Sequence, residues 1–259
     1  MPAADLPPSY PILEYDAAPE AVIEPKQQIT PEDVPTHAVI CFFQGVISRL
    51  VQEHGAKVIK HLRSEIGTHP IYELEVSSKR LAVFQPGVGA PLAASLLEET
   101  IALGCRDFIA CGGAGVLRRE IAVGHIVIPT SAVRDEGTSY HYLPPSREVA
   151  PHPEALAAIE TVLRAHNIEY VTGKTWTTDA IFRETPGKVA RRRDEGCLTV
   201  EMEAAAFFAV AQFRGIRLAQ MLYGGDDVSS EAWDSRHWAS HDVREQLFWL
   251  AAEACLSLT

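Results

Sequence analysis

Apolar runs of strand length alternate with helical stripes from residue 37 onward, and this alternation restricts the possible folds more than any other feature. Residues 37–43 read H-A-V-I-C-F-F, a continuous apolar run typical of a strand covered on both faces. A helical stripe follows and ends at Gly55. The next complete helical stripe is opened by Pro91 and closed by Gly104, an arrangement typical of helix ends.

The alternation continues to a final amphipathic helix. Further strands are predicted at 71–76 and 81–84 as a hairpin, at 108–111, 126–128 and 170–178, in a run ending at Val200, and at 217–223. Further helices are predicted at 153–166, near Pro186, at 204–213 and in the last stretch, which carries Val243 to Ala254. Strands and helices at this spacing predict one α/β domain with a mixed, largely parallel sheet.

The N-terminal segment differs in composition from the rest. Residues 1–35 hold eight prolines and only short apolar pieces, which predicts an extended arm lying on a surface rather than an independent fold. The predicted organisation is therefore a proline-rich arm at 1–35 and an α/β domain at 36–259. The arm is a candidate for reaching a neighbouring subunit.

Charge and cysteine content narrow the function classes. The net charge of −11 argues against nucleic-acid and anionic membrane surfaces, which require clustered Lys and Arg. Five scattered cysteines without C-x-x-C spacing predict buried thiols in a reducing cytoplasm, with neither a disulfide framework nor a zinc site. No signal peptide and no apolar run of membrane-spanning length is seen, so a cytoplasmic protein is expected.

Several familiar catalytic motifs fail on spacing. Residues 172–175 read T-G-K-T, but the glycine that a phosphate-binding P-loop needs five residues before Gly173 is Ile168. Gly87 and Gly89 lack the third glycine of a dinucleotide fingerprint. Neither a G-x-S-x-G elbow nor an H-E-x-x-H motif is present, which argues against serine hydrolysis and zinc proteolysis.

The most informative stretch is T-V-E-M-E-A-A-A-F-F at residues 199–208, where a strand meets a helix. A carboxylate at Glu201 or Glu203 accepts two hydrogen bonds, which suits the vicinal hydroxyls of a ribose. The alternative interpretation is a pair of acids at a helix N-terminus, where the helix dipole favours negative charge. Glycine-rich turns and acids also follow the other strands, and ligands of open α/β sheets bind beyond those strand ends.

Together these motifs resemble the nucleoside phosphorylase and uridine phosphorylase family, including its nucleosidase branch, over roughly residues 37–257. The most specific is V-E-M-E-A at 200–204. The supporting motifs are G-V-G-A-P at 87–91, G-G-A-G at 112–115, V-G-H-I-V-I-P at 123–129, T-T-D-A-I-F at 177–182 and G-D-D at 225–227. The resemblance implies a single-domain, three-layer α/β/α fold with a central sheet.

The resemblance also implies roles for individual residues. Glu203 would hold the ribose 2′ and 3′ hydroxyls while Met202 packs against the sugar, with Glu201 as a supporting acid. Phe182 would lie against the base with Ile181 nearby, and Gly113 would contribute to the substrate pocket. 

Asp227 matches the acid that protonates a purine base at N7. This role requires its pKa to rise, for which the neighbouring charge of Asp226 offers a cause. A helix cap or turn residue is the alternative.

The phosphate site departs from the family pattern, since neither of its arginines is present. The first loop reads F-F-Q-G-V at 42–46, and the second position is Ala110. Phosphate binding through backbone N–H groups is the expectation that remains, at Gly87, Gly89, Gly112 and Gly113. Arg134 or Arg183 is the candidate cation.

The nucleophile and the base therefore stay open at this point. No glutamate occupies 42–46, where the nucleosidase branch activates water. Arg183, Glu184 and the loop at 135–142 are candidate base contacts, with a hydrogen-bonded surface turn as the alternative.

The leading hypothesis is a pentosyltransferase of the nucleoside phosphorylase type. It would cleave the N-glycosidic bond of a nucleoside, with a purine favoured, by using inorganic phosphate and no metal or organic cofactor. The alternatives are hydrolysis of the same bond by water and a non-catalytic nucleoside-binding protein. The resemblance implies a homo-oligomer, either a dimer or a hexamer.

Overall fold

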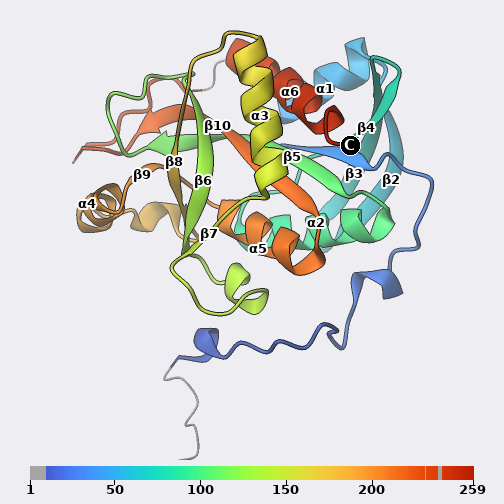
Figure 1. The fold of residues 1–259 in the computed structure, drawn as a ribbon, viewed down its shortest axis with the longest axis horizontal. Coiled ribbons are helices and arrows are strands. Elements are labelled where there is room, and N and C mark those ends of the chain that lie inside the picture. The colour runs from blue at the N-terminus through green and yellow to red at the C-terminus, as the bar shows by residue number, and fades with distance from the viewer. Residues whose placement is uncertain (1–9, 231, 239–240) are drawn as a thin grey trace, which may run out of the picture.

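The computed structural model describes residues 10–230, 232–238 and 241–259 and shows a ten-stranded sheet between helices (Figure 1). The strands are β1 (His37–Cys41), β2 (Lys57–Ser64), β3 (Gly67–Val76), β4 (Lys79–Phe84), β5 (Asp107–Val116), β6 (Ile126–Asp135), β7 (Glu148–Val149), β8 (Tyr170–Thr178), β9 (Cys197–Glu201) and β10 (Arg217–Asp227). The α-helices are α1 (Gln44–Glu53), α2 (Ala90–Leu103), α3 (Pro153–Ala165), α4 (Pro186–Asp194), α5 (Ala204–Arg214) and α6 (His241–Leu256). Short 3-10 helices are η1 (Pro11–Leu13), η2 (Pro25–Gln27), η3 (Thr138–His141) and η4 (Ile181–Arg183).

The sheet is partly closed on itself. Its strand order is β10-β6-β8-β9-β5-β1-β4-β3-β2, and β10 also pairs with β5. The strands β10, β6, β8, β9 and β5 therefore form a ring, from which β1, β4, β3 and β2 extend as an open sheet. Five strand pairings are parallel and five are antiparallel, so the predicted mixed sheet is confirmed, with less parallel character than expected.

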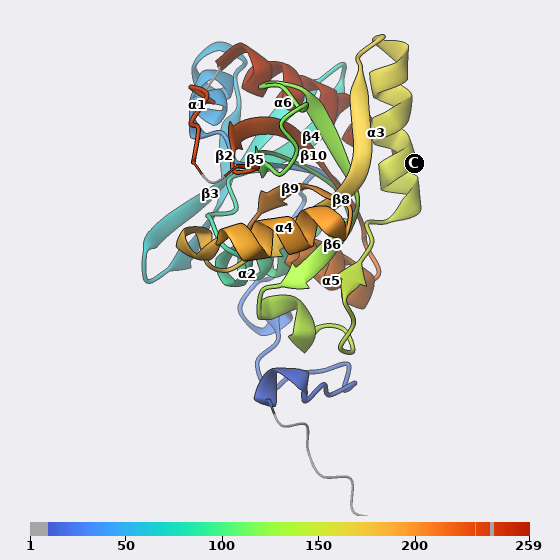
Figure 2. The ribbon, with the colours of Figure 1, turned by 90° about the vertical axis from the view of Figure 1, so that its left-hand side faces the viewer.

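Helices cover both faces of the sheet and give the predicted three layers. The helices α1, α3 and α6 lie on one face, and α2 and α5 lie on the other, while α4 flanks β9 (Figures 1 and 2). Successive side chains of a strand point to opposite faces, so Val39 packs in the core that contains Phe248 and Ile40 in the core that contains Phe207. Each such side chain contributes about 1.5–3 kcal/mol when fully buried. The unbroken apolar run in β1 follows from this two-sided burial.

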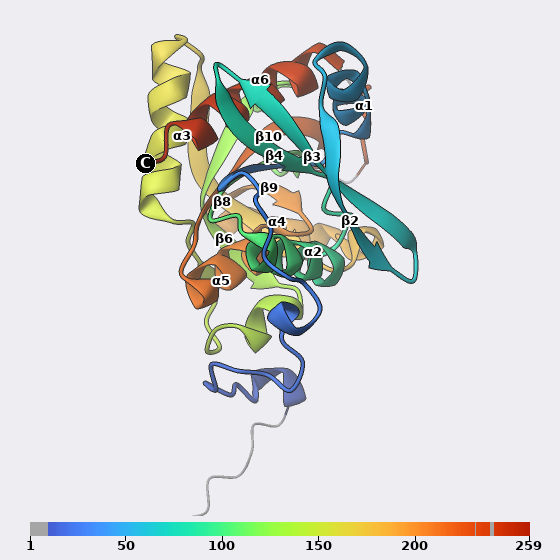
Figure 3. The same ribbon diagram turned by 90° about the vertical axis from the view of Figure 1, so that its right-hand side faces the viewer.

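The described part of the N-terminal segment lies along the outside of the rest of the chain. It runs past α2 and below η3 (Figure 3). Ile29 is buried in the core beneath α2, and Glu24 pairs with Arg214 of α5. The predicted arm segment 1–9 lies outside the described residues.

Two local features differ from or sharpen the sequence prediction. The strand β2 was not predicted, because its sequence K-V-I-K-H-L-R-S is mostly polar and its side chains are largely exposed. The hairpin of β3 and β4 is confirmed, with Ser77 and Ser78 both at positive φ in its turn.

All five cysteines are buried free thiols, as expected. Within the described residues, no helix is both long and apolar enough to span a membrane.

Candidate active site

The two predicted glutamates occupy the turn between β9 and α5 and point in different directions. Glu201 Oε2 accepts hydrogen bonds from the N–H groups of Glu203 at 2.7 Å and Ala204 at 2.6 Å. Its other oxygen accepts from the Thr177 hydroxyl at 2.6 Å. Glu201 therefore satisfies the free N–H groups at the start of α5, as its alternative interpretation proposed, and thereby fixes the backbone of Glu203.

The carboxyl group of Glu203 makes fewer hydrogen bonds than that of Glu201, so more of it is left to bind a ligand. Among the described residues its hydrogen-bonding partner is the N–H of Gly89, which donates to Oε1 at 2.6 Å. Burial raises the pKa of Glu201 to about 7, and burial together with the charge of Glu201 raises that of Glu203 to about 8. Because Glu201 accepts more hydrogen bonds that stabilise its charge, we place the shared proton on Glu203 in the ligand-free protein.

The turn at 85–89 forms one wall beside Glu203. Gly87 and Gly89 both have positive φ, 79° and 96°, a backbone conformation that favours glycine. The Gly87 N–H donates to Gln85 Oε1 at 2.8 Å, and the Gly89 N–H is taken by Glu203. The prediction that these two N–H groups bind phosphate is therefore wrong for this conformation, because both are already hydrogen bonded.

Gly112 and Gly113 do not form an anion-binding turn either. Both lie within β5 and neither has positive φ, whereas an anion nest needs alternating right- and left-handed backbone. A Cβ at Gly112 would lie 3.1 Å from the Phe42 ring, and one at Gly113 would lie 3.1 Å from the Tyr223 ring. These glycines allow close packing of aromatic rings against β5, and the substrate contact of Gly113 stays a prediction.

Arg134 is not available as the phosphate cation. Its side chain is buried, and its guanidinium stacks 4.3 Å from the centroid of the Tyr140 ring. It donates hydrogen bonds to the 139–146 loop, at Ser139, Leu143, Pro144 and Ser146. The prediction of a phosphate contact is corrected here, since Arg134 instead holds this loop in place. Arg183, the other candidate cation, is exposed at the end of η4.

Asp227 does not have the raised pKa that its predicted role requires. Its carboxylate pairs with Arg236 and accepts the Ser229 N–H at 2.8 Å. Burial alone would raise the pKa of Asp227, but Ser229 and Arg236 outweigh burial and lower it. The expectation that Asp226 raises this pKa is therefore wrong, and Asp227 is a charged partner of Arg236 in the ligand-free protein.

The predicted base contacts Phe182 and Ile181 lie on the surface. Phe182 is 94% exposed and Ile181 is 54% exposed, both in η4, so neither side chain is packed in the protein interior. Met202 is half-buried between Glu201 and Glu203. The Phe182 ring is uncovered in this structure, so it would contact a base only if a bound ligand or a second chain covered it.

Sequence reasoning missed Arg236 and Trp233, which both follow β10. Arg236 pairs with Asp227, and the Trp233 indole donates to Asp226 at 2.7 Å. No regular sequence spacing predicted these two residues, because they lie in an irregular loop that folds back against the end of β10. Glu184 was named only as one of several base contacts, and its environment depends on β10, which is distant in sequence.

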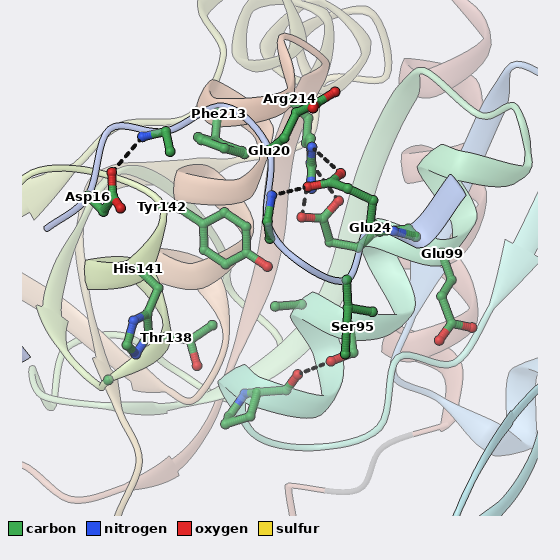
Figure 4. Close-up of a pocket in the computed structure, with 18 of the residues that line it drawn as sticks. Asp16, Glu20, Glu24, Ser95, Glu99, Thr138, His141, Tyr142, Phe213 and Arg214 are labelled. Carbon is green, nitrogen blue, oxygen red and sulfur yellow. Dashed lines mark hydrogen bonds and ion pairs between the residues drawn. The ribbon is translucent and has the colours of Figure 1, made fainter. Parts of the chain in front are cut away.

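A large cavity lies next to the site, between the N-terminal arm and the domain (Figure 4). Its volume is about 790 Å³. Figure 4 shows Tyr142 and Phe213 on one side, with Arg214 beside Glu24 of the arm. Four residues of the 135–142 loop, which the sequence predicted as base contacts, line this cavity, namely Gly137, Thr138, His141 and Tyr142, whereas Glu201 and Glu203 do not.

Comparisons with known proteins identify what this arrangement is similar to. A model described as the phosphorylase superfamily matches residues 36–254. A guanosine phosphorylase of Halorubrum lacusprofundi is 33% identical over 137 residues, which cover 53% of this chain and 57% of the relative. A uridine phosphorylase of Haemophilus influenzae is 27% identical over 163 residues, covering 58% and 64%. The match thus spans about three-fifths of the length of these relatives.

Solved structures share the fold at lower identity. A uridine phosphorylase of Vibrio fischeri has a TM-score of 0.75 at 20% identity, covering 88% of this chain and 95% of that one. A purine nucleoside phosphorylase of Toxoplasma gondii also has 0.75, at 19% identity, covering 89% and 96%. An AMP nucleosidase of Bacteroides thetaiotaomicron has 0.70 at 22% identity, covering 86% and 87%. At these identities the likeness concerns the fold alone.

Proposed function

This chain belongs to the phosphorylase superfamily, and we propose that it cleaves the N-glycosidic bond of a purine nucleoside with phosphate, giving the free base and ribose 1-phosphate. The observation that carries the proposal is the buried Glu203 at the β9–α5 turn, with one carboxyl oxygen bonded to Gly89. Once it has lost the proton that it holds in the ligand-free protein, a carboxylate at this place accepts two ribose hydroxyls. It also stabilises the positive charge that develops on the sugar as the bond breaks.

Support for a purine comes from the comparison rather than from Asp227. The guanosine phosphorylase relative is the more similar of the two relatives described, at 33% identity. The sequence R-E-T-P-G that follows Phe182 contains no glutamine, so it lacks the glutamine–arginine pair with which uridine phosphorylases read uracil. A purine nucleoside is therefore the first substrate to test.

Hydrolysis of the same bond is the second candidate, and a specific observation favours it. The N–H groups of Gly87 and Gly89 are already bonded, and Phe42 lies against Gly112. Phosphorolysis therefore requires the 85–89 turn to release its N–H groups, or another cation to bind phosphate. Water needs no such anion site.

The experiment that tests both candidates is a nucleoside screen with product analysis, in phosphate buffer and in phosphate-free buffer. Phosphorolysis predicts ribose 1-phosphate and strict phosphate dependence, whereas hydrolysis predicts free ribose in both buffers. Glu203→Gln is expected to lower kcat/KM by about 100-fold, because the amide lacks the charge that stabilises the sugar cation. Full turnover in this variant would reject the assigned role. Ligand-induced thermal stabilisation without product in either buffer would instead indicate a binding protein.

Assembly and environment are part of the proposal. We propose a homo-oligomer, because Phe182 and the arm residue Val22 are exposed apolar side chains of the kind that interfaces cover. A monomer by light scattering would contradict it. Five buried free thiols support a reducing compartment such as the cytoplasm. The proposed chemistry needs no metal or organic cofactor.

A further inference from the structure

Phosphorolysis needs a group that binds the phosphate dianion, and neither predicted cation is held in place for this. Arg134 is buried and donates to its own loop, while Arg183 is exposed on η4. A guanidinium binds a phosphate group best when it offers two parallel N–H donors. The inference that follows rests on the proposed function and names the residue that binds its phosphate.

Arg244 in α6 is a guanidinium held in place by aromatic side chains. Its Cζ atom lies 5.3 Å from the centroid of the Phe43 ring and 4.9 Å from that of the Trp238 ring. Its Nε donates to the Tyr223 hydroxyl at 3.0 Å, and that hydroxyl donates to the Trp238 carbonyl oxygen at 3.0 Å. These contacts fix a half-buried side chain.

The same contacts leave the outer part of the guanidinium unused. Among the residues that the structure describes, neither Nη group of Arg244 has a hydrogen-bonding partner, and no carboxylate forms an ion pair with it. The neighbouring Glu245 pairs with Arg49 instead. Arg236, by contrast, pairs with Asp227 and donates to two carbonyl oxygens. Arg244 therefore keeps both Nη groups, the pair of donors that matches two phosphate oxygens.

The loop after β1 connects Arg244 to the glutamate turn. Phe43, on which Arg244 stacks, directly follows Phe42. The centroids of the Phe42 and Phe207 rings lie 6.3 Å apart. Phe207 belongs to the first turn of α5, and its N–H donates to the Glu203 carbonyl oxygen at 3.0 Å. Two adjacent residues of one loop thus contact the cation and the helix that begins after Glu203.

The strand β5 provides a second connection between the same groups. The Tyr223 hydroxyl, which accepts from Arg244, would lie 3.2 Å from a Cβ at Gly113 of β5. Two residues further along β5, Gly115 pairs with Val200 of the antiparallel β9. The chain after Val200 therefore runs back toward Gly113 as it enters the turn before α5. The guanidinium and the glutamate turn thus approach the carboxyl-terminal half of β5, and ligands of open α/β sheets bind at such strand ends.

We propose that Arg244 binds the phosphate that attacks the nucleoside, and that Tyr223 is the positioning residue that fixes the guanidinium. Two phosphate oxygens accept hydrogen bonds from the Nη groups. Another oxygen bonds to C1′ as the bond from C1′ to the base breaks. The base leaves with the electron pair of that bond and takes up the proton of the hydrogen phosphate, so no further reactant is needed.

The first test measures binding of inorganic phosphate to the ligand-free protein by titration calorimetry, with the ionic strength kept constant by chloride. Arg244→Gln removes the charge, so its affinity for phosphate should fall about 10- to 100-fold. Arg244→Lys keeps the charge but loses the paired donors, and an intermediate loss is expected. Arg63→Gln changes an exposed arginine of β2 and should bind phosphate like the unaltered protein.

Two calorimetric results would overturn the proposal. One is equal affinity for phosphate in Arg244→Gln and in the unaltered protein, which would place the anion elsewhere. The other is no binding of phosphate by the unaltered protein.

Steady-state kinetics separate phosphate binding from a general loss of structure. In Arg244→Gln the KM for phosphate should rise about 10- to 100-fold, while the KM for the nucleoside stays within a few-fold. Tyr223→Phe removes the hydroxyl that accepts from Nε. In this variant the KM for phosphate should rise several-fold with kcat nearly unchanged. Equal rises in both KM values would mean that these residues act only on the structure, and would reject the proposal.

The outcomes distinguish this inference from the proposed function. Phosphorolysis with an unchanged phosphate KM in Arg244→Gln would overturn this inference alone. Cleavage to free ribose in phosphate-free buffer would overturn phosphorolysis as the reaction. Phosphate binding that depends on Arg244 in the calorimeter would still support the anion site in that case.

Discussion

The protonation of Glu203 links the candidate site to stability. An unfolded glutamate has a pKa of 4.5, whereas Glu203 in the folded protein has a pKa of about 8. Between these values the folded state holds a proton that the unfolded state has lost. Stability from this group is therefore complete below pH 4.5 and is lost as pH rises to 8. One proton gives a slope of at most about 1.4 kcal/mol per pH unit.

Glu203→Gln removes this titration, so its free energy of unfolding should fall less between pH 5 and pH 8 than that of the unaltered protein. Urea unfolding at several pH values measures the difference. The exposed Glu65→Gln is the matched control and should follow the unaltered protein. Parallel curves for Glu203→Gln and the unaltered protein would show that Glu203 is ionised throughout.

The resemblance singled out this glutamate but not its partners. The V-E-M-E-A motif predicted different roles for Glu203 and Glu201, and in the structure the two side chains have different partners, with Glu201 bonded to backbone N–H groups. The partner of Glu203 is Gly89, which is 114 residues away in sequence. The raised pKa expected for Asp227 was wrong for the same reason, because its pKa depends on Arg236 in an irregular loop.

At the scale of elements, Thr177 connects β8 to the start of α5. Its hydroxyl donates to Glu201 and accepts the Ala205 N–H at 3.0 Å. Thr177→Val leaves that buried N–H without a partner, so we expect a loss of about 1–3 kcal/mol in the free energy of unfolding.

The control for this prediction is Thr161→Val, an exposed threonine of α3 whose hydroxyl bonds only to its own helix. It should change stability by less than about 0.5 kcal/mol. Urea unfolding of both variants gives the comparison. Equal, small effects would mean that Glu201 alone fixes the start of α5.

The 85–89 turn is the second element on which the site depends. Gly89 has φ of 96° and its N–H holds Glu203, yet no atom lies within 4 Å of a Cβ placed there. Gly89→Ala therefore adds backbone strain without a clash, and we expect a cost of about 1 kcal/mol or more in unfolding free energy. KM for the nucleoside should rise with it, since the turn positions Glu203, the carboxyl group that we propose binds ribose.

Measuring both quantities distinguishes the turn from a merely structural loop. Gly45→Ala is the control, because Gly45 lies in α1 and a Cβ there also meets no atom within 4 Å. Alanine is favoured over glycine inside a helix, so this variant should be neutral or more stable. A rise in KM in both variants would contradict a specific role for Gly89.

The elements themselves were largely predictable, and the exceptions have physical causes. Strands buried on both faces, such as β1 and β5, are recognisable in the sequence as apolar runs. The strand β2 lies at the edge of the sheet and is mostly exposed, so its residues carry no apolar pattern. Apolar periodicity in a sequence reflects the burial of side chains. An exposed edge strand such as β2 buries few side chains, so its sequence lacks this signal.

At the scale of the whole molecule, the closure of the sheet decides where the site forms. Because β10 pairs with both β5 and β6, its end at Asp226 is placed beside β9 and the end of β8. Local sequence does not encode this closure, since it depends on pairings between strands about 100 residues apart. For this reason the sequence pointed to the two acids that follow β10, but not to the different partners of Asp226 and Asp227.

One attachment of the arm to this closed domain is Glu24, which is buried against Arg214 while Arg214 also pairs with Glu98 of α2. Glu24 further accepts the Ala21 N–H at 2.6 Å, so it organises the arm as well as anchoring it. Glu24→Ala removes both functions. We expect trypsin to cleave the arm after Lys26 several-fold faster in this variant, with the domain remaining intact.

Two further variants identify which contact holds the arm. Glu24→Gln keeps an acceptor for the Ala21 N–H but loses the charge that pairs with Arg214. An intermediate cleavage rate in this variant would mean that both contacts help to hold the arm. Glu14→Ala alters an exposed arm residue and should leave the rate unchanged. Unchanged cleavage in Glu24→Ala would assign the attachment to Ile29, whose side chain is buried beneath α2. Because the arm also forms a wall of the 790 Å³ cavity, faster cleavage would show that the arm can detach from this cavity while the α/β domain stays folded.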